Sequence, residues 1–208
     1  MSFQGLKEQV LQYAQTGYNQ GLMAGTSGNL SVLSDCGHIV ITPSSLNYST
    51  MTTDDVMVIT LDGTIIEGPH KPSSEWPMHA EIYKQMQDVK SVVHTHSPYA
   101  TAFSVINEPI PLALIEMVYS LLGDVRVAPV ALQGTADVGI GVVEALQGRG
   151  GCLMQNHGAL SIGSSLGEAY VRTEYIEDAA KICYMAKTMG NVTLIPDEMI
   201  QKMFARIQ

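Results

Sequence analysis

Short apolar runs joined in pairs by tight turns constrain the fold of this chain more than any other feature. The pairs and their turns are 30–33 with 38–42 around Asp35-Cys36-Gly37, and 56–60 with 64–67 around Asp62-Gly63. Turn residues between two strand-like runs reverse the chain, so each pair predicts an antiparallel hairpin. Hairpins this early in the chain predict a sheet that is largely antiparallel.

Segments with helical spacing of apolar residues surround these hairpins. They predict helices over 3–20, 77–88, 98–106, 112–122, 136–147 and 165–189. Additional apolar runs predict strands at 91–95, 125–130 and 151–155. Because no repeat or linker interrupts the pattern, residues 1–208 are predicted to form one α/β domain with helices packed on the sheet.

The charge of the chain limits the ligands it can attract. The formal net charge is -9, and only 15% of the residues are charged, so a basic face for nucleic acid is not expected. A phosphate group would have to be held locally, by a metal, backbone N–H groups, hydroxyls or a single cation.

Cysteine spacing and hydropathy bear on the compartment. Cys36, Cys152 and Cys183 form no CxxC pair, which favours reduced thiols over disulfides or a cysteine metal site. The longest apolar stretch, 112–122, is interrupted by Glu116 and is too short to cross a membrane. With no signal peptide expected either, the prediction is a cytoplasmic protein without membrane partners.

His94 and His96 give the sharpest chemical signal in the sequence. Side chains two apart on a strand point to the same side, so the predicted strand 91–95 would direct both imidazoles to one point. Such a pair fits a divalent metal, although two unrelated histidines remain an alternative. His157, placed beside Gly158 at the end of a second apolar run, adds a third candidate ligand.

Three histidines with one open position are typical of catalytic zinc, whereas structural zinc is usually closed by four protein ligands. Glu75 follows the hydroxyl-rich loop Lys71-Pro72-Ser73-Ser74. Near a metal it would serve as a fourth ligand, a general base, or both in turn. The simpler alternative is a glutamate at a helix N-terminus, stabilised by the helix dipole.

Loops of small and hydroxyl residues offer a second kind of site. They are Thr26-Ser27-Gly28-Asn29, Thr42-Pro43-Ser44-Ser45 and Ser73-Ser74. Their backbone N–H groups and hydroxyls can hold a phosphate dianion, although each is also an ordinary turn sequence. No nucleotide-binding glycine motif accompanies them.

These motifs together resemble the class II aldolase/adducin head family, typified by L-fuculose-1-phosphate aldolase. The matching elements occur in order along almost the whole chain: Gly25-Thr26-Ser27-Gly28-Asn29-Leu30-Ser31, Thr42-Pro43-Ser44, Lys71-Pro72-Ser73-Ser74-Glu75, His94-Thr95-His96-Ser97 and Asn156-His157-Gly158. The resemblance implies an α/β/α sandwich with a central antiparallel sheet, assembled as a homotetramer with active sites at subunit interfaces.

The resemblance also implies the chemistry. One Zn²⁺ per subunit would be bound by His94, His96 and His157, with Glu75 as metal neighbour and acid/base. The phosphate of a sugar phosphate would be held by Gly28, Asn29, Thr42, Ser44, Ser73 and Ser74. The implied reaction is cleavage of a small ketose 1-phosphate, similar to L-fuculose 1-phosphate, to dihydroxyacetone phosphate and an aldehyde.

One position departs from the aldolase pattern. Where the aldolases carry a catalytic tyrosine, this chain has Ile115, with Glu116 beside it and Tyr119 about one turn further on. Glu116 and Tyr119 are therefore the candidates for the second proton-transfer group. Glu116 resembles the acid/base of the family's dehydratases, which keeps dehydratase and decarboxylase chemistry open, whereas a glutamate after the serine pair favours an aldolase over an epimerase. The metal histidines argue against a non-catalytic, adducin-like role.

Overall fold

One mixed sheet organises the computed structural model, which describes residues 2–206. Its strands are β1 (Asn29–Leu33), β2 (Ile39–Ile41), β3 (Met57–Ile59), β4 (Ile65–Glu67), β5 (Ser91–Thr95), β6 (Arg126–Ala128), β7 (Gly151–Met154) and β8 (Gly158–Gly163). They lie in the order β4-β3-β2-β1-β5-β8-β7-β6. Only β6 and β7 pair in parallel, which confirms a largely antiparallel sheet.

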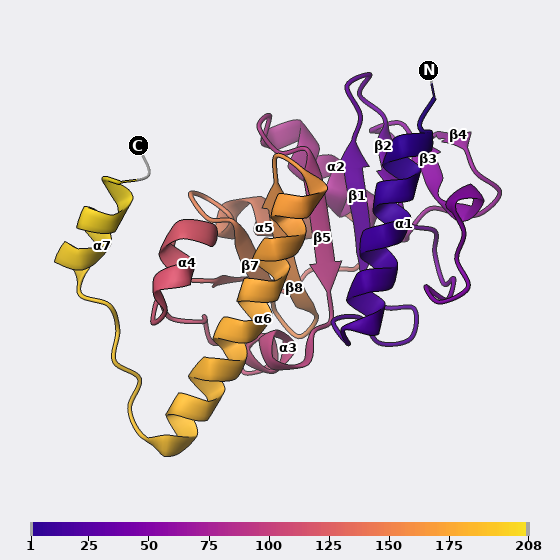
Figure 1. Ribbon diagram of the computed structural model, residues 1–208. Helices are drawn as coiled ribbons and strands as arrows, with labels where there is room; N and C mark the ends of the chain where they lie inside the picture. The colour runs from indigo at the N-terminus through magenta and orange to yellow at the C-terminus, as the bar shows by residue number, and fades with distance from the viewer. Residues whose placement is uncertain (1, 207–208) are drawn as a thin grey trace.

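Helices cover both faces of this sheet. They are α1 (Gln4–Asn19), α2 (Trp76–Gln85), α3 (Pro98–Val105), α4 (Ile115–Ser120), α5 (Ala136–Ala145), α6 (Leu166–Met189) and α7 (Asp197–Phe204), with a short 3-10 turn η1 (Thr53–Asp55). Figure 1 shows α1 and α6 crossing the front of the sheet, with α2 and α5 behind it. The α/β/α sandwich is thereby confirmed.

Alternation along the strands decides which side chains meet which helices. Ile39 and Ile41 pack with α2 and α5, whereas Val40 between them packs with α1 and α6. In β5, Val92 likewise faces α2 and α5, and Val93 faces α1. Each such buried aliphatic side chain contributes about 1.5–3 kcal/mol to folding. His94 follows Val93, so the alternation turns it toward the α2 side.

Three parts of the structure differ from the sequence-based expectations. β8 was not predicted, because its sequence Gly-Ala-Leu-Ser-Ile-Gly is rich in small residues with weak strand preference. His157 consequently lies in the turn between β7 and β8 rather than at the end of a strand. The helix expected over 112–122 is confined to Ile115–Ser120, and α7 forms in a segment where no element was expected.

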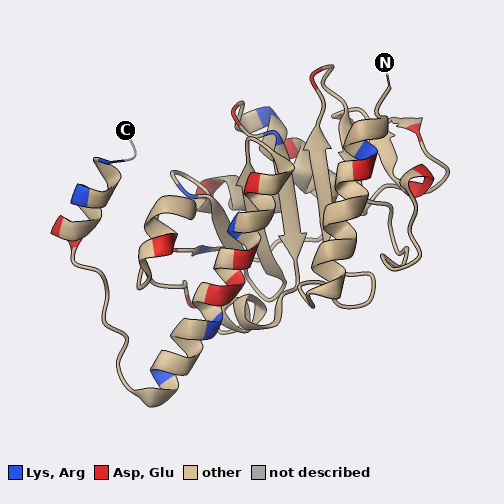
Figure 2. Ribbon diagram, viewed as in Figure 1, with Lys and Arg blue, Asp and Glu red and all other residues tan. Residues whose placement is uncertain are grey.

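Charged side chains are dispersed over the described elements. Figure 2 shows acidic residues recurring along α6, while Lys and Arg occur singly rather than gathered on one face. Among the helices of residues 2–206, none combines the length and apolar character that a membrane crossing needs.

Candidate metal and catalytic site

His94 lies in the middle of the sheet, on the central strand β5. It pairs in register with Asn29 of β1 on one side and Leu160 of β8 on the other, and it is fully buried. Its Nδ1 lies 2.9 Å from the carbonyl oxygen of Ala159, which can only accept, so Nδ1 carries the proton. The Nε2 lone pair is therefore free for a metal, and the ring orientation is fixed by the strand pairing.

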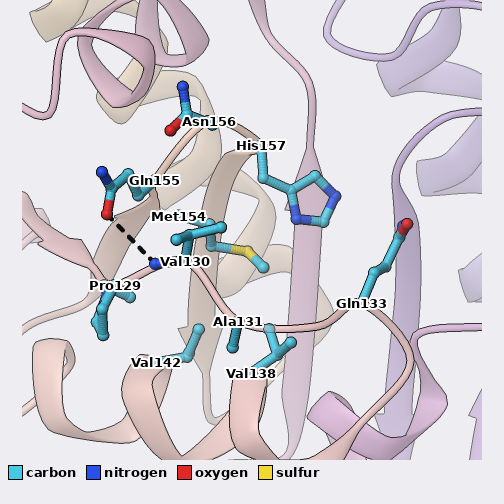
Figure 3. A pocket seen from close by; sticks show the side chains of 11 residues that line it. Pro129, Val130, Ala131, Gln133, Val138, Val142, Met154, Gln155, Asn156 and His157 are labelled. Atoms are coloured by element: carbon cyan, nitrogen blue, oxygen red, sulfur yellow. Dashed lines mark hydrogen bonds between the residues drawn. The ribbon is translucent and has the colours of Figure 1, made fainter.

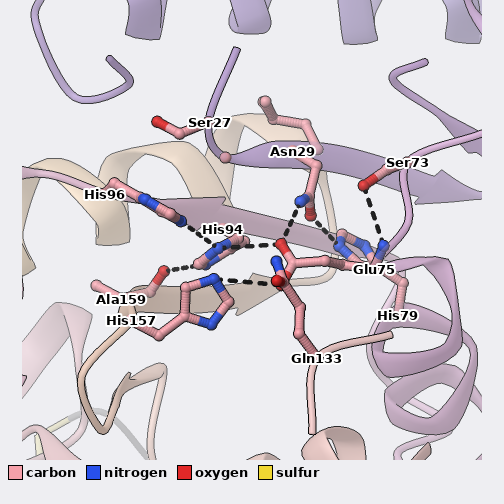
Figure 4. A network of polar contacts seen from close by, with 12 residues as sticks. Ser27, Asn29, Ser73, Glu75, His79, His94, His96, Gln133, His157 and Ala159 are labelled. Carbon is pink, nitrogen blue, oxygen red and sulfur yellow. Dashed lines mark hydrogen bonds and ion pairs between the residues drawn. The ribbon is translucent and has the colours of Figure 1, made fainter. Parts of the chain in front are cut away.

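His96 and His157 complete a compact group with His94 (Figure 4). The ring centroids are 4.6–4.9 Å apart, and one ligand nitrogen from each ring lies within 4.8 Å of the others. His96 follows the end of β5, and His157 belongs to the β7–β8 turn. Gly158 allows this approach, because a Cβ there would sit 2.2 Å from the carbonyl oxygen of Thr95.

Glu75 brings a carboxylate to the same point from the start of α2. It is only 5% exposed, and its Oε2 lies 3.2 Å from Nε2 of His94. Its Oε1 lies 3.3 Å from Nε2 of His157. Each oxygen also accepts one amide hydrogen bond, Oε2 from Asn29 at 2.7 Å and Oε1 from Gln133 at 3.2 Å.

The electrostatic setting of Glu75 keeps it ionised. Burial raises the pKa of the Glu75 carboxyl, but the attraction to His94 and His157, the close contact with His94 and the hydrogen bond from Asn29 outweigh this effect. The resulting pKa lies well below its ordinary value. A buried anion beside three imidazoles is a setting that favours a bound cation.

The donor set fits a divalent metal such as zinc. The buried Nε2 of His157 receives no hydrogen bond from any described residue, and Nε2 of His94 lies 3.1 Å from Nε2 of His96. Burial first, and then the neighbouring His94 and His157, lower the pKa of His96 to about 4, so its ring is neutral near pH 7. Neutral imidazoles with a nearby carboxylate are ligands that zinc and other divalent transition metals bind.

A polar cavity of about 330 Å³ opens beside this group. Its lining is mostly small and hydroxyl-bearing: Ala24, Thr26, Ser27, Gly28, Asn29, Pro43, Ser44, Ser45, Ser73, Ser74, Glu75, His96 and Gln133. No Lys or Arg of residues 2–206 is among the lining residues. Any phosphate here would be held by N–H groups, hydroxyls and a metal, as the low positive charge of the sequence indicated.

Five of the six predicted phosphate residues line this cavity, and Thr42 does not. Thr42 is fully buried, and its hydroxyl lies 3.3 Å from the backbone nitrogen of Leu30. It thereby holds the residue that directly follows the loop 26–29. Gly28 has φ +77°, and a Cβ there would lie 2.8 Å from the carbonyl oxygen of His94. Only glycine lets the loop approach β5 this closely.

A second cavity, of about 220 Å³, has His157 among its lining residues (Figure 3). Its walls are mainly apolar: Ala128, Pro129, Val130, Ala131, Val138, Val142 and Met154, with the polar Gln133, Gln155, Asn156 and His157 completing the lining. Gln133 lines both cavities.

Glu116 and Tyr119, the candidates for the second proton-transfer group, lie on the surface helix α4. Both are exposed, Tyr119 by 43%, and Tyr119 borders a separate depression with Arg172. Within one chain the structure therefore does not bring them to the histidines. Their role remains a prediction that depends on a neighbouring copy.

Two residues that hydrogen-bond to Glu75 or to its partner Asn29 were not predicted from the sequence. Gln133 belongs to a loop with no recognised motif, and His79 is one of three histidines outside the metal group. The only available signal for His79 was its position one helical turn after Glu75, on the same side of α2.

Comparisons with known proteins agree with this geometry. Residues 8–184 match the family described as Class II Aldolase and Adducin N-terminal domain. The chain is similar to 5-deoxy-D-ribulose 1-phosphate aldolase of Bacillus thuringiensis serovar kurstaki, with 32% identity over 100% of this chain and 98% of the relative. It is also similar to L-fuculose phosphate aldolase of Methanococcus maripaludis, with 33% identity over 83% of this chain and 92% of the relative.

Among solved structures, one described as L-fuculose 1-phosphate aldolase superposes with a TM-score of 0.94 at 33% identity. The superposition covers 100% of this chain and 98% of the other.

Proposed function

The chain belongs to the Class II Aldolase and Adducin N-terminal domain family, and on that premise we propose a zinc-dependent aldolase acting on a small ketose 1-phosphate. The products would be dihydroxyacetone phosphate and an aldehyde. The relatives by sequence and by fold are class II aldolases, so the chain is an enzyme of the lyase class.

The observation that carries the proposal is the convergence of His94, His96, His157 and Glu75 at the edge of a hydroxyl-lined cavity. The three histidines would hold the metal, with Glu75 as a neighbour or additional ligand. A divalent metal bound there would polarise the ketose carbonyl and stabilise negative charge on its oxygen as the carbon–carbon bond breaks.

Glu75 is the group placed to move a proton at the reacting carbon. In the cleavage direction the Glu75 carboxyl, which must first take up a proton, would donate it to C3 of the ketose after the C3–C4 bond breaks. In the synthetic direction the same carboxylate would remove that proton. Its two amide partners hold the carboxylate in one orientation, which general acid/base catalysis requires.

The two cavities suggest how the substrate lies. The phosphate would occupy the polar cavity, held by Gly28, Asn29, Ser44, Ser73 and Ser74, with Thr42 supporting the loop. The carbon chain would then pass the histidines toward the apolar cavity. An apolar end group on the aldehyde half fits these walls better than a hydroxylated one.

This arrangement favours ketose 1-phosphates whose far end is deoxygenated. The relative from Bacillus thuringiensis is named for 5-deoxy-D-ribulose 1-phosphate, and other relatives for L-fuculose phosphate. Substrates of both kinds carry a terminal methyl group. A 5-deoxypentulose or 6-deoxyhexulose 1-phosphate is accordingly the proposed substrate class.

The proton of the C4 hydroxyl needs a second acceptor. We propose that Glu116 or Tyr119 supplies it from a neighbouring copy in a homotetramer, since both are exposed on α4. Exposed apolar side chains at Ile115 and Val171 lie near them on the surface and suit such a contact.

The test is a panel of ketose 1-phosphates assayed for dihydroxyacetone phosphate, with metal content measured on the same preparation. We expect about one zinc per chain and faster cleavage of the 5-deoxy and 6-deoxy compounds than of their hydroxylated counterparts. Glu75→Gln should lose more than about a hundredfold in kcat and still bind zinc. Dehydration instead of cleavage would contradict the proposal and favour Glu116 as the acid/base of a dehydratase.

A further inference from the structure

His79 is a fully buried histidine that the proposed reaction does not use. It lies on α2, has no exposed surface, and binds a partner through each ring nitrogen. Figure 4 shows its contact with Asn29. Nε2 lies 2.5 Å from Oδ1 of Asn29, and Nδ1 lies 2.6 Å from Oγ of Ser31. The Ser31 hydroxyl in turn lies 2.6 Å from the hydroxyl of Tyr83.

Hydrogen-bonding rules leave one consistent arrangement of protons in this chain of contacts. The carboxylate of Glu75 can only accept, so the Asn29 group facing it must be the NH₂ of the amide. The Asn29 oxygen then faces His79 and must receive a proton from Nε2–H. With Nε2 protonated and the ring neutral, Nδ1 accepts from Ser31, and Ser31 accepts from Tyr83.

If the Asn29 amide were turned over, its oxygen would face the Glu75 carboxylate at 2.7 Å, and two acceptors would repel each other in a buried site. Its NH₂ group would also face the Nε2–H of His79. The Glu75 carboxylate and the Nε2–H of His79 therefore select the same orientation of the amide, one at each end. Burial strengthens this selection, since water cannot replace a lost partner.

We propose that His79, as the neutral Nε2–H tautomer with Nδ1 bonded to Ser31, is a positioning residue that orients Asn29 and through it the Glu75 carboxylate. The proposal rests on the proposed function, in which Glu75 transfers the proton. His79 itself lines neither cavity and bonds to none of the metal histidines. Its effect would thus fall on the orientation of Glu75.

The tautomer is tested directly on the unmodified zinc-loaded protein. Long-range ¹H–¹⁵N correlation spectra of the histidine side chains distinguish the two neutral tautomers and the imidazolium. The His79 resonances are assigned by their loss in His79→Gln. We expect a proton on Nε2 and none on Nδ1 near pH 7. A proton on Nδ1, or on both nitrogens, overturns the proposal, and this result does not depend on any activity.

Variants then test the effect on catalysis. His79→Leu removes the donor to Asn29, whereas His79→Gln keeps an N–H group near the position of Nε2. Misplacement of a catalytic group by about 1 Å can lower a rate about 100-fold. We expect kcat to fall about 10- to 100-fold in His79→Leu and less in His79→Gln, with KM within about threefold and zinc content unchanged. His38→Leu, in the β1–β2 turn, is the matched control.

A double-mutant cycle with Asn29→Ala separates positioning from general structural damage. If His79 acts through Asn29, adding His79→Leu to Asn29→Ala should lower kcat no further. The proposal is refuted if the kcat losses of the two single variants multiply in the double variant. It is also refuted if His79→Leu folds, binds zinc and keeps an unaltered kcat. If His79→Leu does not fold, the tautomer measurement and the kcat of His79→Gln decide whether the proposal holds. Absence of aldolase activity in the unmodified protein would count against the proposed function, leaving the tautomer result to judge His79.

Discussion

At the scale of single residues, the carboxylate of Glu75 is held by one amide on each oxygen. Asn29 comes from the start of β1, and Gln133 comes from the loop before α5. The two amides differ in their support, because Asn29 is buried and Gln133 is on the surface side. Gln133 is thus the hydrogen-bond partner of Glu75 that can be substituted with the least damage to the fold.

Replacing Gln133 with glutamate should alter the pH dependence of the reaction. A second carboxylate about 3 Å from Oε1 of Glu75 would disfavour the ionised form and raise the pKa of the base. In the condensation direction, where Glu75 removes the proton, we expect the acid limb of the kcat/KM profile to move to higher pH. The matched control is Gln133→Met, which removes the hydrogen bond without adding charge, so its acid limb should move less. Unchanged profiles in both variants would show that Gln133 does not approach Glu75 in the working enzyme.

At the scale of elements, α6 supports the segment that carries His96. The carboxylate of Glu177 accepts hydrogen bonds from the backbone N–H groups of Tyr99 at 3.0 Å and Ala100 at 2.9 Å. These are free donors at the start of α3, which begins directly after His96 and Ser97. A carboxylate at this end also interacts favourably with the helix dipole.

Glu177→Ala should therefore destabilise the protein by about 1–3 kcal/mol, because two half-buried N–H groups lose their charged acceptor. Glu177→Gln, which still offers one acceptor oxygen, should lose less. Urea unfolding at fixed zinc concentration measures both values. Asp178→Ala changes the next, exposed carboxylate on α6 and should shift stability by less than about 0.5 kcal/mol. Equal losses at 177 and 178 would contradict this role for Glu177.

The same scale explains what the sequence could and could not predict. The hairpins, and the approach of His94 to His96, depend on residues close together in the sequence. Turn residues and strand alternation were therefore sufficient to predict them. β8 could not be predicted, since its glycines and small residues become a strand only between β5 and β7. Asn29 is 50 residues from His79, and Gln133 is 58 from Glu75, distances over which spacing gives no information.

At the scale of the whole molecule, the buried histidine makes folding sensitive to acid. Burial lowers the pKa of His79 to about 3 from its ordinary value of 6.5. Below pH 6.5 the unfolded chain binds a proton at this site that the folded chain does not, so stability falls as pH drops toward 3. Above pH 6.5 neither state is protonated, and the contribution is constant.

We expect the metal-free protein to lose stability between pH 6.5 and 4, and His79→Gln to lose less over the same interval. Urea unfolding at several pH values, with circular dichroism as readout, gives both slopes. His70→Gln is the control, since His70 lies at the surface beside Asp55 and its removal leaves the buried site intact. Parallel slopes for His79→Gln and the unmodified protein would show that His79 is not buried as a neutral group.

Metal removal should also destabilise the entire fold, because the candidate ligands come from segments far apart in the chain. His94 belongs to β5, His157 to the β7–β8 turn, and Glu75 precedes α2. A metal that binds only the folded protein adds about 2.7 kcal/mol when its free concentration is 100 times its dissociation constant. We expect chelation to lower the thermal unfolding temperature and added zinc to restore it. In His157→Ala the difference in unfolding temperature between chelated and zinc-supplemented protein should shrink. If chelation does not change the unfolding temperature of the unmodified protein, a metal at this site is excluded.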